Sequence, residues 1–230
     1  MGPDALAHDA LVHDALVHVI DDDDAARDSL LFLLETEGIA ATGYASADGF
    51  LEVADASTLS GCIITDVRMP GMSGIELLQA VRERGSTVPV VVITGHGDIA
   101  LAVEAMKAGA RDFLEKPYRD DALIGAVRAA LEDVRRNAGT GGDRMTADRA
   151  TADREAACHR FIGLSPRERE VLDGLVAGSS NKTIARQLGI SPRTVEVYRA
   201  NLMTKTQATS LSHLVRLAMA AGVVSTEPPV

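Results

Sequence analysis

Short apolar runs alternate with longer amphipathic segments along the first half of the chain. The runs carry strand-forming residues and lie at 16–20, 40–44, 61–66, 88–94 and 111–116. The segments between and after them have the apolar spacing of helices and lie at 25–38, 46–56, 74–84, 98–108 and 119–136. Strands that alternate with helices predict βαβ units and a doubly wound, five-stranded parallel sheet.

The fourth run shows how these strands are placed. "VVVI" at 90–93 is apolar without any alternation, as expected of a strand that is covered on both faces. Gly38 and Gly109 lie where the first and fourth helices should end, and glycine is the usual residue just beyond a helix. We therefore expect residues 16–138 to form an α/β domain.

The pattern is helical throughout from residue 161. Ser165-Pro166 and Ser191-Pro192 are helix-start signals, in which a serine cap is followed by proline in the first turn. Asn181 is the expected cap of a short helix at 182–188, and Gly189 turns the chain into a longer helix at 192–205. This order predicts a helix-turn-helix within a four-helix domain at 161–224. A helical bundle used for protein contacts is the alternative.

The remaining segments lack a core-forming pattern. Residues 139–160 hold three glycines and the near repeat "TADRA", "TADRE", which predicts a linker. Residues 1–15 hold the repeat "HDALV" and are expected to be an extension, and 225–230 a tail. The repeat places His8, His13 and His18 five residues apart, which spreads them around a helix and argues against a shared metal site.

Charge divides the chain in the same way. Residues 1–138 hold 24 acids and 11 bases, a net charge of −13, whereas residues 161–224 hold 4 acids and 8 bases, a net of +4. The basic half therefore suits nucleic acid and the acidic half does not. No run approaches the roughly 20 apolar residues of a membrane span, and the first residues lack the basic start of a signal peptide. With only two distant cysteines, the protein is expected to be cytoplasmic, with no membrane partner.

Polar side chains follow the predicted strands at one end. Asp21 and Asp22 follow the first run, Asp66 ends the third, Thr94 ends the fourth and Lys116 ends the fifth. The carboxyl ends of parallel strands lie at one edge of a sheet, where ligands bind in such folds. Carboxylate oxygens from separate strands suit Mg²⁺. Asp23 and Asp24, next in the same run, are expected to cap the following helix.

This set of side chains suits acceptance of a phosphoryl group. Asp66 would attack phosphorus as a nucleophile and form an acyl phosphate. Lys116 would neutralise charge on the transferred oxygens, and the Thr94 hydroxyl would hydrogen-bond one of them. A solvated acidic rim without a ligand is the alternative.

Three stretches resemble the flavodoxin-like receiver domain of bacterial two-component response regulators. They are "VHVIDDDD" (17–24), "DVRMPGMSGIELL" (66–78) and "VVVITGHGDIALAVEAMKAGARDFLEKP" (90–117). The resemblance implies that Asp66 is the phosphoacceptor and that Thr94 and Phe113 are switch residues. It also implies a cis bond between Lys116 and Pro117. The implied Mg²⁺ ligands are Asp21, Asp22, Asp66 and the backbone carbonyl of Arg68.

Residues 164–219 are similar to the LuxR-type helix-turn-helix of the NarL/FixJ regulator class. This implies that Glu196, Val197 and Ala200 face the bases, where a carboxylate accepts from cytosine and apolar groups pack on thymine methyls. Further implied DNA contacts, mainly to phosphates, are Asn181, Lys182, Thr183, Ser191, Arg193, Thr194, Tyr198, Arg199 and Lys205. The final helix would supply a dimer face, although its apolar residues also fit an ordinary core.

Together the two resemblances imply a phosphorylation-activated transcription regulator of the FixJ branch, which controls nitrogen-fixation genes in rhizobia. The implied partners are a sensor histidine kinase with a haem-based oxygen sensor, promoter DNA, RNA polymerase and a second copy of the chain after phosphorylation. A paralogue with another input signal, an aspartyl-nucleophile phosphatase and a constitutive DNA-binding protein are the alternatives. The helix-turn-helix argues against an enzyme.

Overall fold

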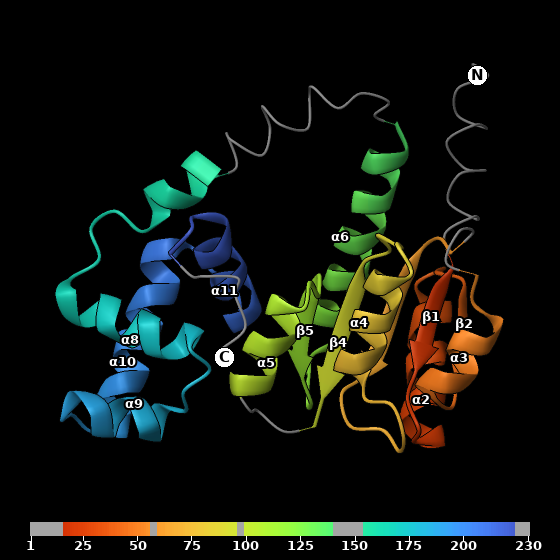
Figure 1. Ribbon diagram of the computed structural model, residues 1–230, viewed down its shortest axis with the longest axis horizontal. Coiled ribbons are helices and arrows are strands. Elements are labelled where there is room, and N and C mark those ends of the chain that lie inside the picture. The colour runs from red at the N-terminus through yellow and green to blue at the C-terminus, as the bar shows by residue number, and fades with distance from the viewer. Residues whose placement is uncertain (1–15, 56–58, 96–98, 140–153, 224–230) are drawn as a thin grey trace. The chain divides into compact units, whose positions relative to one another are not determined.

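The computed structural model describes residues 16–55, 59–95, 99–139 and 154–223 (Figure 1). The predicted N-terminal extension, with His8 and His13, lies outside these ranges. So do Gly141 and Gly142 of the predicted linker and the C-terminal tail.

Five parallel strands form one sheet in the order β2-β1-β3-β4-β5. The strands are β1 (Val17–Ile20), β2 (Ala41–Tyr44), β3 (Cys62–Asp66), β4 (Val90–Thr94) and β5 (Asp112–Glu115). Each strand lies inside the run that predicted it. β3 and β4 are buried along their whole length, which explains why 90–93 has no polar position. The predicted doubly wound parallel sheet is confirmed.

Helices connect the strands and follow the last one. They are α2 (Asp24–Thr36), α3 (Ala47–Val53), α4 (Gly74–Glu83), α5 (Ile99–Lys107) and α6 (Asp120–Gly139). Ser73 and Glu76 close a capping box at the start of α4, which satisfies backbone N–H groups that a helix leaves open. α3 ends three residues before its predicted end because Ala54 is already extended.

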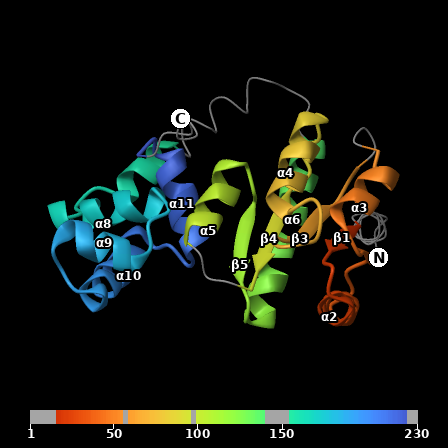
Figure 2. The same cartoon turned by 60° about the horizontal axis from the view of Figure 1, so that its bottom comes forward.

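One face of the sheet packs against α2 and α6. Alternate residues of β1, β3 and β4 bury their side chains there, among Leu30 and Leu34 of α2 and Leu123 and Val127 of α6. Figure 2 shows α2 and α3 on opposite sides of β1. The sheet is therefore covered on both faces, and its strand ends are the natural place for polar chemistry.

The face toward α3 holds a buried histidine. His18 on β1 is only 8% exposed. Its ring centroid lies 5.3 Å from that of Phe50 and 5.9 Å from that of Tyr44, and Nδ1 lies 3.4 Å from the Tyr44 hydroxyl. Burial lowers the pKa of His18 below its usual value, and a hydrogen bond to the Ser60 backbone only partly opposes this.

The lowered pKa predicts a loss of stability in acid. Because the unfolded chain binds this proton more readily than the folded one, stability should begin to fall as the pH drops through about 6.5 and continue to fall until the folded pKa is passed. We expect the urea midpoint of the wild-type chain to fall between pH 7.5 and 5.5. His18→Phe, which keeps a neutral ring, should show a smaller fall. The same pH dependence in both chains would contradict this assignment.

The C-terminal part is helical, as predicted. Its helices are α8 (Pro166–Val176), α9 (Asn181–Leu188), α10 (Pro192–Thr206) and α11 (Leu211–Ala220). Residues 154–160, which the sequence places in the linker, are also helical. Ala157 and Phe161 stand four positions apart, so both face one side and are buried in the core with Leu172 and Leu214. This packing explains why residues 154–160 belong with the C-terminal helices.

The described chain forms two compact units, one built on the strands and the other on the C-terminal helices. The second unit also includes α5. The predicted domain boundary at 138 instead places this helix in the first domain. None of the helices within the described ranges combines the length and the apolar character that a membrane span requires.

Candidate functional site

Three charged side chains stand at the carboxyl edge of the sheet. Asp21 directly follows β1, Asp66 is the last residue of β3, and Lys116 directly follows β5. The strands are parallel, so these positions meet although they are up to 95 residues apart in the chain.

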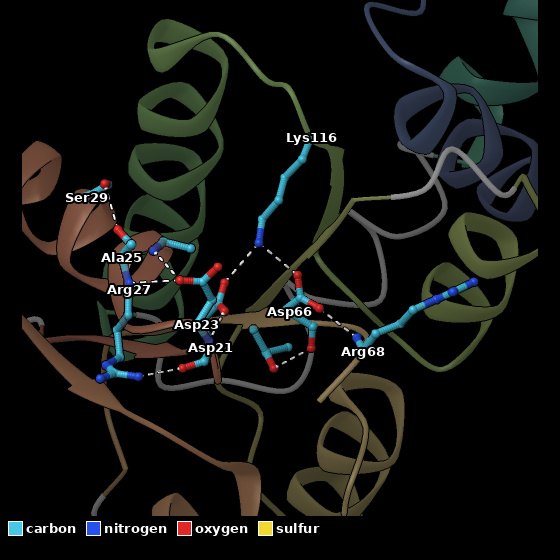
Figure 3. A network of polar contacts seen from close by, with 10 residues as sticks. Asp21, Asp23, Ala25, Arg27, Ser29, Asp66, Arg68 and Lys116 are labelled. Carbon is cyan, nitrogen blue, oxygen red and sulfur yellow. Dashed lines mark hydrogen bonds and ion pairs between the residues drawn. The ribbon is translucent and has the colours of Figure 1, made fainter. Parts of the chain in front are cut away.

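The Lys116 ammonium lies between the two carboxylates (Figure 3). Its Nζ is 2.9 Å from Asp21 Oδ2 and 2.9 Å from Asp66 Oδ1. The side chains of Asp21 and Asp66 are only 4% and 10% exposed, whereas that of Lys116 is 28% exposed. The three groups form one hydrogen-bonded cluster at the surface end of the core.

The carboxylates keep Lys116 charged. Burial by itself would lower the pKa of the ammonium, but hydrogen bonds to Asp66 and Asp21, together with their negative charges, outweigh burial and raise the pKa to about 12. The site therefore contains a fixed positive charge at any working pH.

The second oxygen of Asp66 is held by the backbone. Asp66 Oδ2 accepts a hydrogen bond of 2.6 Å from the Arg68 N–H (Figure 3). Close by, Gly74 begins α4, and a Cβ on this residue would stand 2.2 Å from the Asp66 backbone oxygen. Only glycine lets the helix start this near to Asp66. The sequence pattern did not single out this role, because the close approach is a tertiary contact.

The four aspartates after β1 have different surroundings and partners. Asp21 faces Lys116, while Asp22 is exposed. Asp23 caps α2 by accepting from the backbone N–H of Ala25 and Ala26, and Asp24 pairs with Arg27. The prediction that Asp23 caps the helix is confirmed, and Asp24 lies in its first turn.

Arg27 also holds the backbone at the site. One of its guanidinium nitrogens donates a 2.8 Å hydrogen bond to the Asp21 carbonyl. The carboxylate of Asp21 is steadied as well, since its Oδ1 accepts from the Asp23 N–H at 3.0 Å. Arg27 was not among the predicted site residues, because its partner is a backbone carbonyl.

The donor set fits a hard cation, but the three predicted carboxylates are not grouped. In the part of the chain that the structure describes, no three His, Cys, Asp or Glu side chains stand close enough together to hold a metal ion. Asp21 and Asp66 already share one cation, Lys116, while Asp22 is exposed beside them. Oxygen ligands suit Mg²⁺, and turning Asp22 toward Asp66 would complete the predicted set.

Thr94 and Phe113, the predicted switch residues, are both buried. β4 and β5 pair with Val92 opposite Phe113 and Thr94 opposite Glu115. Side chains alternate along a strand, so Phe113 and Thr94 are on the same face, one step apart on neighbouring strands. The Lys116 N–H donates to the Thr94 carbonyl at 2.7 Å, and the Lys116–Pro117 bond is cis, as the resemblance implied.

The second unit contains the predicted helix-turn-helix. α9 ends at Gly189, whose φ of 67° makes the turn, and Ser191 caps α10 through the Thr194 N–H. The predicted cap of α9 is wrong by one residue. Ser180 caps the helix, and Asn181 instead accepts a hydrogen bond from Arg199 at 3.3 Å.

The predicted base-facing residues form an exposed surface on α10. Glu196, Val197 and Ala200 are exposed and lie at helical spacing on one face. Val197 is 56% exposed, which is unusual for a branched apolar side chain. Lys182 and Arg193 are exposed on α9 and α10.

Other predicted DNA contacts have partners inside the protein. Tyr198 packs partly against the helical core, and Arg199 binds Asn181. The hydroxyls of Thr183 and Thr194 lie within hydrogen-bond distance of the Ser180 and Ser191 hydroxyls, respectively.

Lys205, predicted as a phosphate contact, has a carboxylate partner inside the protein. Its ammonium donates a 2.7 Å hydrogen bond to the buried Glu168 carboxylate, which no prediction had named. The capping pattern Ser165-x-x-Glu168 was readable from the sequence, but the contact with Lys205 was not.

Two family models match the chain. Residues 17–128 match the response regulator receiver domain, and residues 163–218 match the bacterial regulatory proteins of the luxR family. The first match covers the strands with the carboxylate cluster, and the second covers the helix-turn-helix.

Individual proteins are similar over most of the chain. The transcriptional regulatory protein FixJ of Azorhizobium caulinodans is 57% identical over 205 residues, covering 89% of this chain and 92% of that protein. FixJ of Bradyrhizobium diazoefficiens is 51% identical over 207 residues, covering 90% and 96%. The crystal structure of full-length FixJ from B. japonicum has 50% identity and a TM-score of 0.50, covering 92% of this chain and 99% of that one.

Proposed function

This chain belongs to the FixJ family of two-component response regulators, and we propose that it accepts a phosphoryl group on Asp66 and then binds promoter DNA through α10. Proteins of this family are phosphorylation-dependent transcriptional regulators. The observation that carries the choice of Asp66 is its contact with the Lys116 ammonium at 2.9 Å, together with an exposed side-chain fraction of 10% against 4% for Asp21. The proposed receiver spans 16–138 and the proposed DNA-binding domain 161–224.

In the proposed phosphoryl transfer, a phosphohistidine is the donor and Asp66 is the acceptor. A phosphohistidine of a sensor kinase presents its phosphorus to an Asp66 carboxylate oxygen. The new O–P bond forms as the N–P bond breaks, and the imidazole leaves with the electron pair. Lys116 stays hydrogen-bonded near the transferred oxygens, and the Arg68 N–H keeps the carboxylate oriented. Both donors are in place before the phosphoryl group arrives.

Mg²⁺ is the proposed cofactor. Asp21, Asp22, Asp66 and the Arg68 carbonyl would hold it, and it would supply charge neutralisation for the phosphoryl oxygens. The asymmetric burial of the two leading aspartates supports separate roles. Asp21 is fixed in the cluster, while Asp22 is free to turn toward a cation at the surface.

The added phosphate is proposed to act through Thr94 and Phe113. Phosphorylation adds negative charge and acceptor oxygens. Drawing the Thr94 hydroxyl toward them would vacate space on the face that Phe113 shares. The surface formed by β5 and α6 would then change shape and pair with a second copy of the chain.

Phosphate should therefore make DNA binding dimeric. We expect the full-length chain to sediment as a monomer without a phosphodonor and as a dimer with acetyl phosphate and Mg²⁺. Two recognition helices held together would read half-sites about 10 base pairs apart. A phosphorylated chain that stays monomeric while binding DNA tightly would show that phosphate acts by unmasking the DNA-binding domain instead.

The alternatives make different predictions in the same assay. A phosphatase would consume many equivalents of acetyl phosphate rapidly, whereas a regulator is labelled at no more than one phosphoryl group per chain. A constitutive DNA-binding protein would show equal affinity with and without the donor. The net charge of +4 over residues 161–224 supports DNA binding over a helical bundle for protein contacts.

The biological setting is proposed from the relatives. The similarity to FixJ proteins makes nitrogen-fixation genes the proposed targets. RNA polymerase as the recipient of the signal and a haem-based oxygen-sensing histidine kinase as the phosphodonor are proposed from the resemblance to the FixJ branch. A FixJ-like regulator with another input signal is the second candidate. A cytoplasmic location accords with contact to DNA.

A further inference from the structure

Glu168 connects two helices of the DNA-binding unit. Glu168 is only 3% exposed, and its Oε2 accepts three hydrogen bonds. Two come from Ser165, at 2.7 Å from the backbone N–H and 2.8 Å from the hydroxyl, and these close the capping box of α8. The third comes from Lys205 Nζ in the last turn of α10, at 2.7 Å.

The last turn of α10 is held from the same side by further contacts. Lys205 Nζ also lies 3.4 Å from the Gly163 carbonyl, just before α8. Arg160 donates to the Thr206 carbonyl at 3.3 Å. Directly after this turn, Gln207 leaves the helix with a φ of 56°, a conformation that side chains other than glycine rarely adopt. The end of the helix is thus fixed by contacts with residues 160–168.

These contacts also give Lys205, whose side chain is 46% exposed, a carboxylate partner inside the protein. Hydrogen bonds from Lys205, then from the Ser165 N–H and hydroxyl, lower the pKa of the Glu168 carboxyl to about 2, so the carboxylate stays charged at any working pH. A phosphate would have to replace a short, charge-assisted hydrogen bond to a buried carboxylate. Arg193, exposed in the first turn of the same helix, has no such carboxylate partner among the described contacts.

We propose that Glu168 is a positioning residue for DNA recognition, which orients the base-facing side of α10 by holding Lys205. The inference rests on the proposed reading of DNA by α10. Ser191 fixes the start of this helix and the Glu168–Lys205 pair fixes its end, with Glu196, Val197 and Ala200 between them. The pair sets where these side chains meet the groove, and Lys205 itself contributes no phosphate contact.

Three measurements on the full-length, phosphorylated chain test this. The first two are affinity for a random-sequence duplex and for the preferred duplex recovered by selection from a random pool. The third is the slope of log affinity against log salt concentration on the random duplex. We expect Glu168→Gln and Lys205→Gln each to lower the ratio of preferred to random affinity about tenfold, the size of one lost base contact. The double variant should lose no more than either single one, because one contact is removed in all three.

The salt slope separates positioning from a direct contact. Lys205→Gln should leave it unchanged, whereas Arg193→Gln, the matched control, should reduce it by about 0.9, the value of one phosphate contact. A reduction of about 0.9 with Lys205→Gln would overturn the inference. So would an unchanged ratio of preferred to random affinity in the Glu168→Gln chain, including the case in which both affinities fall equally.

The choice of variants keeps the test decisive. Lys205→Gln leaves a buried carboxylate without its cation and can unfold the domain. Glu168→Gln removes that charge and keeps the side-chain volume, so it carries the test alone if the first variant does not fold. Lys205→Arg should restore the wild-type ratio. If the wild-type chain shows no salt-dependent binding to any duplex, the proposed function fails first, and this result differs from every outcome above.

Discussion

We expect the chain carrying Asp66→Asn to take up no phosphoryl group from acetyl phosphate, while the wild-type chain takes up at most one. The amide is nearly the same size as the carboxylate and its oxygen can still accept from the Arg68 N–H or from Lys116. It lacks the anionic oxygen that attacks phosphorus and cannot form the acyl phosphate. The folded structure should therefore survive while the chemistry is lost.

Mass spectrometry of the intact protein measures this loss directly. Asp48→Asn is a suitable control, because Asp48 is an exposed aspartate in the first turn of α3. This variant should be labelled like the wild type. Equal labelling of the Asp66→Asn chain would mean that the phosphoacceptor is another residue, and the proposed roles of Lys116 and Thr94 would fall with it.

Mg²⁺ binding should depend on the first two aspartates of the run and not on the fourth. Asp21→Asn and Asp22→Asn each remove a carboxylate from the proposed ligand set. We expect each to lower Mg²⁺ affinity at least roughly tenfold, because mutation of residues that only orient metal ligands already lowers metal affinity 10- to 100-fold. Asp24→Asn should leave the affinity unchanged, because Asp24 is engaged with Arg27 in the first turn of α2.

The Mg²⁺-dependent rise in the free energy of unfolding measures the affinity without phosphorylation. A ligand that binds only the folded state stabilises it by an amount that follows from its concentration and dissociation constant. Unchanged stabilisation in both the Asp21→Asn and the Asp22→Asn chains would show that the acidic run does not hold the cation.

The fold was largely predictable from the sequence because its determinants are local. Val90–Ile93 is apolar at every position, as expected of a strand covered on both faces, and Ser191-Pro192 marks the start of α10 at the observed residue. The site was predictable for a second reason. Parallel strands bring the residues after β1, β3 and β5 together, whatever their separation in the chain.

Contacts between distant side chains were not predictable in this way. Asn and Ser are equally good helix caps, so the sequence does not decide between Asn181 and Ser180. In the structure the Asn181 side chain accepts a hydrogen bond from Arg199. Lys205 is predicted to contact a phosphate because it is a cation on the recognition helix, and its contact with Glu168 could not be read from the sequence. Its partner Glu168 lies 37 residues earlier and is buried only when α8 and α10 pack. The exposed position of Asp22 is a third case, since the sequence does not specify a side-chain rotamer.

The register between β4 and β5 has a consequence for the timing of the response. Phe113 and Thr94 are diagonal neighbours on one face, and such neighbours lie within reach of an aromatic side chain. The proposed relay from the phosphate to the surface of β5 is therefore one side-chain pair long. Side-chain rotations and small collective shifts are complete within about milliseconds. How quickly the regulator turns on and off is then set by the rates at which Asp66 gains and loses its phosphoryl group, so a lasting output requires a slowly hydrolysed acyl phosphate.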